Sequence, residues 1–331
     1  MNDRPRVAII GCGLIGRKRA DALGANPLVA CADIEIDRAR ALSSRSTAAC
    51  TADWREVVRR DDVDVIIVAT INSLLAEISV AALEAGKHVL VEKPAARNAE
   101  ELELIIAAQK PSGKLVHVGF NHRYHPALLK AKQLHDEGAL GEMMFVRGRY
   151  GHGGRAGYDR EWRADPKLAG GGELIDQGVH LIDLARLFLG AFTHVDGFAR
   201  TYYWDMAVDD NAFLLLRTRN DKTAALHVSC TEWKNLFSLE IYGRQGKLHA
   251  EGLGGSYGLE RLAYYRMLPE MGPPETTIWE FPRGDDSWRV ETAEFLEDIR
   301  LGRKPSATLD DAHAVLTVVG EIYKRSGYDF R

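Results

Sequence analysis

The sequence predicts an α/β fold: a doubly wound parallel sheet, then a C-terminal α/β domain with a large, mainly antiparallel sheet. The first third of the chain alternates short β-branched apolar runs with helical stretches, which is typical of parallel sheets. After about residue 121, longer strand-like segments follow one another, separated by turn signals. A chain of 331 residues is also long for a single hydrophobic core. We therefore expect one domain over residues 1–121 and a second over 122–331.

Strands are expected in the first domain at residues 7–10, 28–32, 63–69, 88–91 and 115–118. Helical stretches lie between them, around 14–24, 35–46, 73–85 and 98–109. In doubly wound sheets, ligands bind at the carboxyl ends of the strands. The residues that follow each strand are therefore the first candidates for a functional site.

Strands are expected in the second domain at residues 143–150, 195–204, 212–217, 223–229, 238–242 and 246–250. A helix is expected over 173–189, and two more over 288–300 and 310–324. This part of the chain has no phosphate-binding signature, so we expect it to supply substrate contacts. A broad sheet with one helical face leaves its other face for pairing with a second subunit, so a homo-oligomer is expected.

The stretch GCGLIG, residues 11–16, directly follows the first strand and predicts a dinucleotide-binding turn. Gly11 would form the tight turn, Gly13 would let the backbone approach a pyrophosphate, and Gly16 would let helix and strand pack closely. Leu14 and Ile15 would begin a helix whose N-terminal N–H groups favour negative charge. The alternative is a glycine turn that serves geometry alone.

Asp33 ends the second strand, at about the separation expected for an acid that binds the adenosine ribose. A carboxylate there accepts hydrogen bonds from the 2′-OH and repels a 2′-phosphate, so NAD is favoured over NADP. The alternative is that Asp33 caps the following helix. Arg38 and Arg40 are the nearby residues that would attract a phosphate.

The tetrapeptide Val91-Glu92-Lys93-Pro94 places a charged pair at the end of a strand. Proline favours extended geometry in the residue before it, so Lys93 is expected to point outward from the sheet edge. A lysine there can hold a substrate hydroxyl and favour an oxyanion-like transition state. The alternative is an ordinary surface Glu–Lys pair.

The segment GGGELIDQGVHLID, residues 170–183, carries the second candidate group. Once the triple glycine gives way to helix, Asp176 and His180 are four residues apart and share one face. A histidine, whose pKa ordinarily lies near neutrality, can take a hydroxyl proton, and a carboxylate one turn away can orient its ring. A histidine satisfied inside a packed helix is the alternative. Asp183 either joins this polar face or faces solvent.

The motifs GCGLIG, EKP and GGGELIDQGVHLIDL, in this order, resemble the Gfo/Idh/MocA oxidoreductases over nearly the whole chain. The resemblance implies an N-terminal Rossmann domain and a C-terminal α/β domain with an open antiparallel sheet, in dimers or tetramers. It also implies that Lys93, Asp176 and His180 form the catalytic constellation.

The same resemblance implies further site residues. Asn121 and Arg123 in GFNHR would line the active site, as would Trp162 and Arg163 in REWRAD. The candidate cofactor contacts are Gly11, Gly13, Leu14, Ile15, Gly16, Asp33, Thr70, Asn72, Glu92 and Lys93.

Two segments depart from the family pattern or stand out from it. Many relatives carry a proline and a histidine after the third strand, where this chain has Ile71 and Leu75. The glycine-rich segment 150–162 is either a mobile loop that closes over substrate or a flexible connection. Its Arg155 and Tyr158 would meet a carboxylate, a phosphate or a nucleotide diphosphate, or serve the structure.

Composition excludes several classes of function. The net charge of −4, with no basic run, gives no attraction to nucleic acid or to an anionic membrane surface. The N-terminus leads into a strand rather than an apolar signal region, so we expect a soluble, cytoplasmic protein. Its cysteines have no metal-ligand spacing, so we expect reduced thiols and no metal site. They are Cys12, Cys31, Cys50 and Cys230.

These observations predict an NAD-dependent dehydrogenase that acts on a secondary alcohol of a sugar, cyclic polyol or sugar derivative. His180 would accept the hydroxyl proton while the carbinol hydrogen leaves as hydride; Asp176 would orient His180, and Lys93 would position the oxygen. Two other functions stay open: a sugar–sugar oxidoreductase that never releases its cofactor, and a non-catalytic, dinucleotide-binding sugar sensor. Free sugars, inositols and nucleotide-linked sugars all stay open as substrates.

Overall fold

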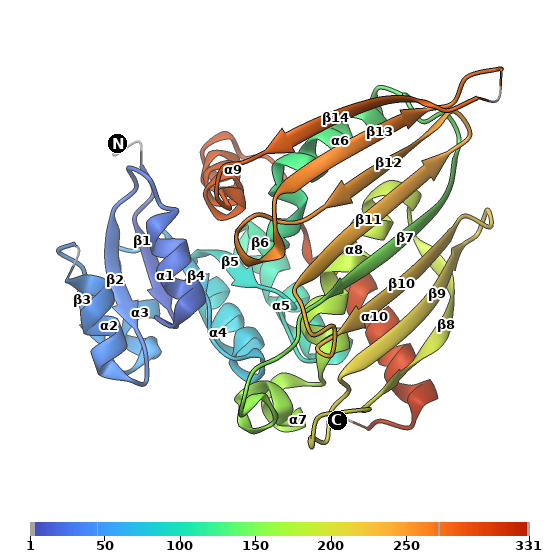
Figure 1. Ribbon diagram of the computed structural model, residues 1–331. Helices are drawn as coiled ribbons and strands as arrows, with labels where there is room; N and C mark the ends of the chain where they lie inside the picture. The colour runs from blue at the N-terminus through green and yellow to red at the C-terminus, as the bar shows by residue number, and fades with distance from the viewer. Residues whose placement is uncertain (1–3, 45, 271, 330–331) are drawn as a thin grey trace. The chain divides into compact units, whose positions relative to one another are not determined.

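The computed structural model describes residues 4–44, 46–270 and 272–329 (Figure 1). The chain forms two compact units. Unit 1 comprises Met1–Phe120 and Trp288–His313, and unit 2 comprises Asn121–Ser287 and Ala314–Arg331. The junction near residue 120 agrees with the expected boundary, but the expected second domain is not continuous. The segment from Trp288 to His313 belongs to unit 1.

Unit 1 contains a six-stranded parallel sheet in the order β3-β2-β1-β4-β5-β6. Its strands are β1 (Val7–Ile10), β2 (Leu28–Ala32), β3 (Ala49–Thr51), β4 (Val65–Val68), β5 (His88–Glu92) and β6 (Val116–Gly119). Its helices are α1 (Leu14–Asp21), α2 (Ile36–Ser43), α3 (Trp54–Val58), α4 (Asn72–Glu84), α5 (Ala99–Ser112) and α9 (Ser287–Leu301). The strand order reverses between β1 and β4, as in doubly wound sheets.

The core of unit 1 explains why α9 returns to it. Val7 and Ile9 of β1 are fully buried, and they share one apolar cluster with Phe295 and Leu296 of α9. After α9, the Ala307 carbonyl accepts the N–H of Val118 in β6 at 3.1 Å. The apolar stripe of α9 shows in the sequence, but its packing partner does not. The expected domain boundary therefore missed this return.

Unit 2 contains an eight-stranded sheet in the order β14-β13-β12-β11-β7-β10-β9-β8, antiparallel except between β7 and β10. Its strands are β7 (Met143–Gly151), β8 (Phe192–Arg200), β9 (Asn211–Thr218), β10 (Thr223–Ser229), β11 (Leu236–Gly243), β12 (Gly246–Glu251), β13 (Glu260–Arg266) and β14 (Glu275–Phe281). Together the two sheets confirm the predicted fold class.

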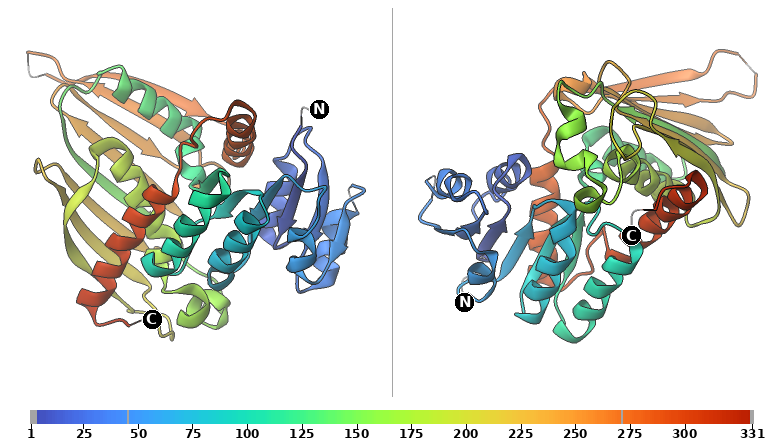
Figure 2. Two further views of the ribbon diagram at one scale, coloured as in Figure 1. Left: turned by 180° about the vertical axis from the view of Figure 1, so that it is seen from behind. Right: turned by 90° about the horizontal axis from the view of Figure 1, so that it is seen from below.

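Helices cover one face of the unit 2 sheet (Figure 2). They are α6 (Pro126–Asp136), α8 (Val179–Leu189) and α10 (Leu309–Ser326). Burial alternates along the central strands, so one face packs under the helices while the other is partly exposed. Strand β8 ends earlier than expected. It stops at Arg200 rather than 204, because the Asp210 carboxylate accepts the N–H groups of Tyr202 and Tyr203 at 2.9 and 2.7 Å.

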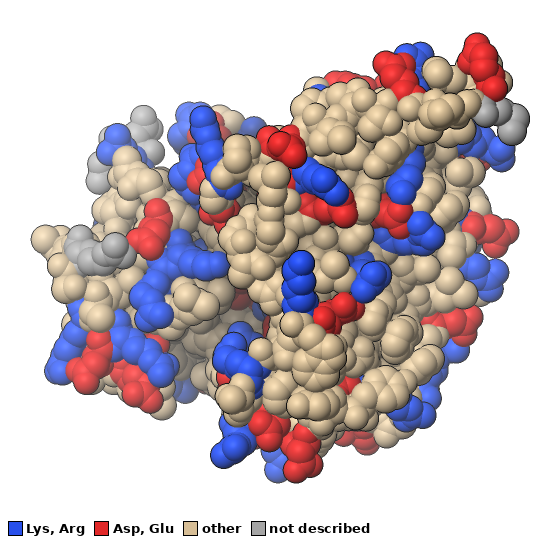
Figure 3. Space-filling model, viewed as in Figure 1, with Lys and Arg blue, Asp and Glu red and all other residues tan. Residues whose placement is uncertain are grey.

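The surface mixes both signs of charge. Basic and acidic side chains alternate across the face seen in Figure 3, in keeping with the small net charge of −4. Within the described ranges, none of the helices combines the length and apolar composition needed to span a membrane.

Candidate active site

The glycine turn of unit 1 has the geometry that a dinucleotide requires. Gly11 has φ +93°, and a Cβ there would lie 2.4 Å from the Ala69 carbonyl oxygen. A Cβ on Gly16 would lie 1.9 Å from the Gly11 oxygen, so α1 can pack this close to β1 only with glycine. A Cβ on Gly13 would meet no atom within 4 Å. The open side of the turn is therefore at Gly13, where a pyrophosphate is expected to approach.

The N-terminus of α1 suits an anion. The helix begins at Leu14, and its N-cap is Gly13, which has no side chain that could cap the first-turn N–H groups. The first-turn N–H groups of a helix, here including those of Leu14 and Ile15, lack acceptors within the helix. These groups and the helix dipole fit a phosphate group, so the turn can hold the pyrophosphate of NAD.

Asp33 is tied to the glycine turn. Its Oδ2 accepts the Cys12 N–H at 2.7 Å, and its Oδ1 accepts the Glu35 N–H at 2.9 Å. Helix α2 starts only at Ile36 with Glu35 as its N-cap, so Asp33 is not the helix cap that the alternative interpretation required. A carboxylate has about four acceptor sites, and two remain for the ribose hydroxyls. The nearby Arg40 pairs with Asp37 at 3.0 Å.

The segment after β4 differs from the family pattern in a way the packing explains. Leu75, one of the two positions at which the sequence departs from the expected family pattern, is fully buried on α4 and belongs to the core. Thr70 donates to the Ile71 carbonyl at 3.3 Å, and Asn72 is the buried first residue of α4. Thr70 and Asn72 lie after the carboxyl end of β4 and stay candidate cofactor contacts.

Glu92 belongs to a buried ion network rather than to a surface Glu–Lys pair. Arg19 of α1, itself fully buried, donates from Nε to Glu92 Oε1 at 2.7 Å and lies 2.6 Å from Glu291 of α9. Burial raises the pKa of Glu92, and Arg19 opposes that shift. Lys93 follows Glu92 at the end of β5, and the Lys93–Pro94 peptide bond is cis. Glu92 was predicted to contact the cofactor, but its carboxylate is held by Arg19.

In unit 2, Asp209 holds the start of the segment that carries Asp176 and His180. Its carboxylate accepts the N–H of Gly172 at 2.9 Å and that of Leu174 at 2.8 Å. A Cβ on Gly172 would lie 2.0 Å from the Asp209 carbonyl oxygen, which explains the glycine. The triple glycine therefore lets a buried carboxylate approach the backbone.

The expected continuous α-helix over 173–189 is different in the structure. Residues Leu174–Gly178 form a π-helical turn, and α8 follows from Val179. Such wide turns occur often at functional sites. Asp176 lies in this turn and His180 at the start of α8, and His180 is 3% exposed.

Asp176 has a cationic partner that the sequence pattern did not pair with it. Arg163 Nε donates to Asp176 Oδ2 at 3.1 Å, and the guanidinium lies 4.6 Å from the ring centre of its neighbour Trp162. Burial disfavours the charge on Arg163, but Asp176 and other nearby groups outweigh it and raise the pKa of Arg163. Unit 2 thus brings Trp162, Arg163 and Asp176 together.

Asn121 and Arg123 lie on a short 3-10 helix, Asn121–Tyr124, and serve different contacts. Arg123 forms a buried ion pair with Asp183 of α8, with Nε 2.7 Å from Oδ2. Asp183 is 1% exposed, so it does not face solvent, and its carboxylate holds the Arg123 guanidinium. Asn121 bonds to Ser287 and to His122.

Sequence reasoning missed several residues next to His180. His122 stacks on His180 with ring centroids 3.7 Å apart, and Tyr150 lies 6.3 Å from His180, edge on. Tyr257 lies 5.5 Å from Tyr150. The one available signal was the position of His122 between two residues already chosen, Asn121 and Arg123.

The glycine-rich segment is anchored at Tyr158. This ring is 5% exposed, packs 5.6 Å from Trp204, and its hydroxyl lies 3.5 Å from the buried Glu173 carboxylate. Arg155 pairs with Glu161 at 2.7 Å within the same segment. Tyr158 therefore has a packing role.

Comparison with known proteins agrees with this architecture. A family model described as an oxidoreductase family with an NAD-binding Rossmann fold matches residues 5–120, and one described as the GFO/IDH/MocA C-terminal domain matches residues 128–249. Levoglucosan dehydrogenase of Pseudarthrobacter phenanthrenivorans is 30% identical over 284 residues, covering 73% of this chain and 72% of that protein. The NAD(+)-dependent scyllo-inositol 2-dehydrogenase of Bacillus subtilis is 27% identical, covering 96% and 93%.

Solved structures give the same result. A levoglucosan dehydrogenase in complex with NADH and L-sorbose has a TM-score of 0.85 and 26% identity, covering 98% of each chain. The glycine turn, its strand-to-helix setting and the matched domains confirm the predicted resemblance and the NAD cofactor. The chain belongs to the Gfo/Idh/MocA family of NAD-binding oxidoreductases.

Proposed function

We propose that the protein is an NAD-dependent dehydrogenase that oxidises a secondary alcohol of a sugar, a cyclic polyol or a sugar derivative. The observation that carries this proposal is the buried His180 beside the π-helical turn with Asp176, in a chain whose other unit has the NAD-binding turn. The names of the relatives, levoglucosan and inositol dehydrogenases, support this substrate class.

In the proposed reaction His180 takes the proton of the substrate hydroxyl. NAD, when bound, supplies the acceptor for the hydride that leaves the carbinol carbon. Lys93 provides the cation that stabilises the oxygen as it loses its proton. In the reducing direction His180 returns the proton.

Asp176 acts with Arg163. Because its Oδ2 accepts from Arg163 at 3.1 Å, the carboxylate is held in place and stays available to a neighbouring imidazolium. We assign Asp176 the orientation of His180, and Arg163 and Trp162 contacts to the substrate. Asn121 is assigned to the same site through His122.

The test is NADH formation, measured by absorbance, with inositols, aldoses, anhydrosugars, uronic acids and nucleotide sugars. We expect turnover with NAD on at least one of these, and a loss of about 10²–10⁴-fold in kcat for His180→Ala. His194→Gln, on the exposed side of β8, is the matched control and should keep full activity. Normal turnover of His180→Ala would refute the assignment, whereas NAD binding without turnover on any alcohol would favour the sensor.

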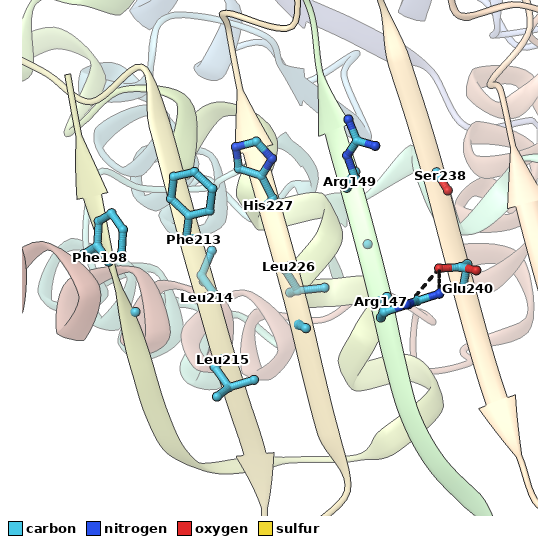
Figure 4. A pocket seen from close by; sticks show the side chains of 13 residues that line it. Arg147, Arg149, Phe198, Phe213, Leu214, Leu215, Leu226, His227, Ser238 and Glu240 are labelled. Carbon is cyan, nitrogen blue, oxygen red and sulfur yellow. Dashed lines mark hydrogen bonds and ion pairs between the residues drawn. The ribbon is translucent and has the colours of Figure 1, made fainter. Parts of the chain in front are cut away.

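We also propose that the uncovered face of the unit 2 sheet joins two copies of the chain. This face presents Phe198, Phe213 and Leu215 at 42%, 37% and 48% exposure (Figure 4). Phe213 stacks on His227 with centroids 4.2 Å apart. Exposed aromatic and aliphatic side chains on a broad sheet are typical of subunit interfaces. Light scattering should give a dimer or tetramer, and Leu215→Asp should give monomers; a monomeric wild-type protein would refute this.

Finally, we propose a cytoplasmic location. The four cysteines are free thiols, and three of them are buried, which suits a reducing compartment. Fractionation of the native host should find the protein with cytoplasmic enzymes.

A further inference from the structure

Unit 2 contains a pair of stacked imidazoles that includes the proposed base. His122 and His180 lie face to face, with ring centroids 3.7 Å apart and planes 21° apart. Both side chains are buried, with 6% and 3% of the residue exposed. His122 comes from the 3-10 helix and His180 from α8, so packing between elements holds the stack.

Hydrogen bonds fix which ring nitrogen of His122 carries the proton. The Ser287 hydroxyl donates to Asp285 at 2.5 Å, so its oxygen accepts the Asn121 amide N–H at 2.9 Å. The Asn121 carbonyl oxygen therefore faces His122 Nδ1, at 3.2 Å. Because a carbonyl oxygen can only accept, Nδ1 is the protonated nitrogen of neutral His122.

Other charged and titratable groups lie near the pair on several elements. His125 lies 5.4 Å from His122 by ring centroids, and its Nδ1 is 2.9 Å from Glu260. Its Nε2 is 3.8 Å from Asp285. Strand β7 contributes Tyr150, 5.1 Å from His122, and burial raises the pKa of its phenol.

Three further residues near the pair in sequence or in space are paired or apolar. Arg123, beside His122 in sequence, is neutralised by Asp183 of α8. Asp176 of the π-helical turn bonds to Arg163. Strand β11 contributes the apolar ring of Phe237, 6.0 Å from His122. The Asp183 and Asp176 carboxylates each bond to an arginine, and the two stacked rings have their centroids 3.7 Å apart.

We propose that His122 is a positioning residue that limits the stacked pair to a single proton, so that His180 accepts the hydroxyl proton only while His122 is neutral. The limit on the pair stands on its geometry, and its catalytic consequence rests on the proposed function. Two neighbouring carboxylates share one proton because both cannot be negative at once; here two neighbouring imidazoles share one proton because both cannot be positive at once.

The size of the effect follows from the ring separation. Two unit charges 3.7 Å apart, at an effective dielectric constant of about 20, repel strongly enough to separate two titrations by roughly three pH units. After the first proton binds to the pair, the second should bind only at a pH roughly three units lower.

The direct test is a titration of the full-length, ¹⁵N-labelled protein, observed through the imidazole nitrogens between pH 4.5 and 9. His122→Phe and His180→Phe assign the two rings among the 11 histidines and keep an aromatic ring in each place. In the wild-type protein we expect one ring to titrate first and the other to stay neutral for at least two further pH units. When its partner is replaced by Phe, the ring that binds its proton second should show a pKa at least two units higher than in the wild-type protein.

Midpoints less than one unit apart in the wild-type protein would overturn the proposal. This measurement needs no substrate. Either Phe variant alone identifies one ring of the pair by the signal that it removes, and the other ring by the signal that it shifts, so one folded variant is enough. His194→Gln, in an exposed place on β8, is the control and should leave both rings unchanged.

The activity test uses the pH profile of kcat/KM in the oxidation direction. The acid side should fall with slope one, because one proton on the pair stops the reaction. Asn121→Asp should hold the proton on His122 and move this limb up by at least one unit, which is a tenfold loss at a fixed acidic pH. An unmoved limb in a folded, active Asn121→Asp variant would contradict the catalytic part. If no alcohol reacts, the proposed function fails, while the titration still tests the pair.

Discussion

Replacement of Asp209 by asparagine tests how the segment with Asp176 is held. Burial raises the pKa of Asp209 from 3.8 to about 6, against the effect of the backbone N–H groups that it accepts. Since the folded-state pKa is the higher one, folding favours the protonated form. The resulting stability is fully present below pH 3.8 and is lost as the pH rises through about 6.

The magnitude follows from these two pKa values. Between pH 7.5 and pH 4.5 the folded state gains almost one proton at Asp209, whereas the unfolded chain gains only a small fraction of one. The difference in unfolding free energy between the wild-type protein and Asp209→Asn should therefore be about 2 kcal/mol more favourable to the wild-type protein at pH 4.5 than at pH 7.5.

The assay is urea denaturation of both proteins at the two pH values, followed by far-UV circular dichroism. The comparison must be a difference between proteins, because burial lowers the pKa of His88 to about 4 and gives the opposite pH dependence in the same window. Asp205→Asn is the matched control, because Asp205 is exposed and lies in the same connection between β8 and β9 as Asp209. A difference that stays constant with pH, or grows toward pH 7.5, would refute the reasoning.

The remaining predictions concern unit 1. Gly16→Ala should lower stability by at least about 2 kcal/mol and weaken NAD binding more than tenfold, since its Cβ would meet the Gly11 oxygen at 1.9 Å; a normal melting temperature would contradict this. Gly13→Ala should weaken NAD binding with little change in melting temperature, because its Cβ has no protein neighbour within 4 Å. Asp33→Asn should raise the Kd for NAD by calorimetry and reduce the preference over NADP. Arg19→Met should cost about 3–5 kcal/mol in urea denaturation, because it leaves buried carboxylates without a cation.

Strands and helices could be predicted where the local sequence pattern is strong. The buried runs of β1, β2 and β10 were placed at their observed bounds, because their residues are apolar or alternate cleanly. The edge strands β3 and β14 were missed. Strand β3 has three residues, two of them exposed, and β14 is exposed over most of its length, so neither has a buried face to mark it. Strand β13 and helices α3 and α6 were also not predicted.

Candidate site residues could be proposed from the sequence where the local motif carries the chemistry, as at Asp33 and His180. They were not predictable where a distant residue decides the geometry. Asp209 lies 37 residues after Gly172, and nothing in the local pattern shows that its carboxylate would replace helical hydrogen bonds there. The π-helical turn could not be predicted for the same reason.

The buried Arg19 network gives a reason for the glutamate next to Lys93. A buried ion pair adds little stability by itself, because desolvation offsets the attraction between its charges. Its geometry is what matters here. Arg19 joins α1, which follows the glycine turn, to the end of β5 and to Glu291 of α9. Burial would raise the pKa of Glu291, but Arg19 and His117 outweigh it and lower that pKa.

The same network explains a glycine on the neighbouring strand. A Cβ on Gly119 would lie 2.8 Å from Arg19 Nη2 and 3.0 Å from Glu92 Oε2, so β6 must end in glycine for the pair to fit beside it. One guanidinium therefore holds both the helix that follows the glycine turn and the strand end that precedes Lys93. Because both are anchored to the same side chain, a change at Arg19 should affect NAD affinity and the position of Lys93 together.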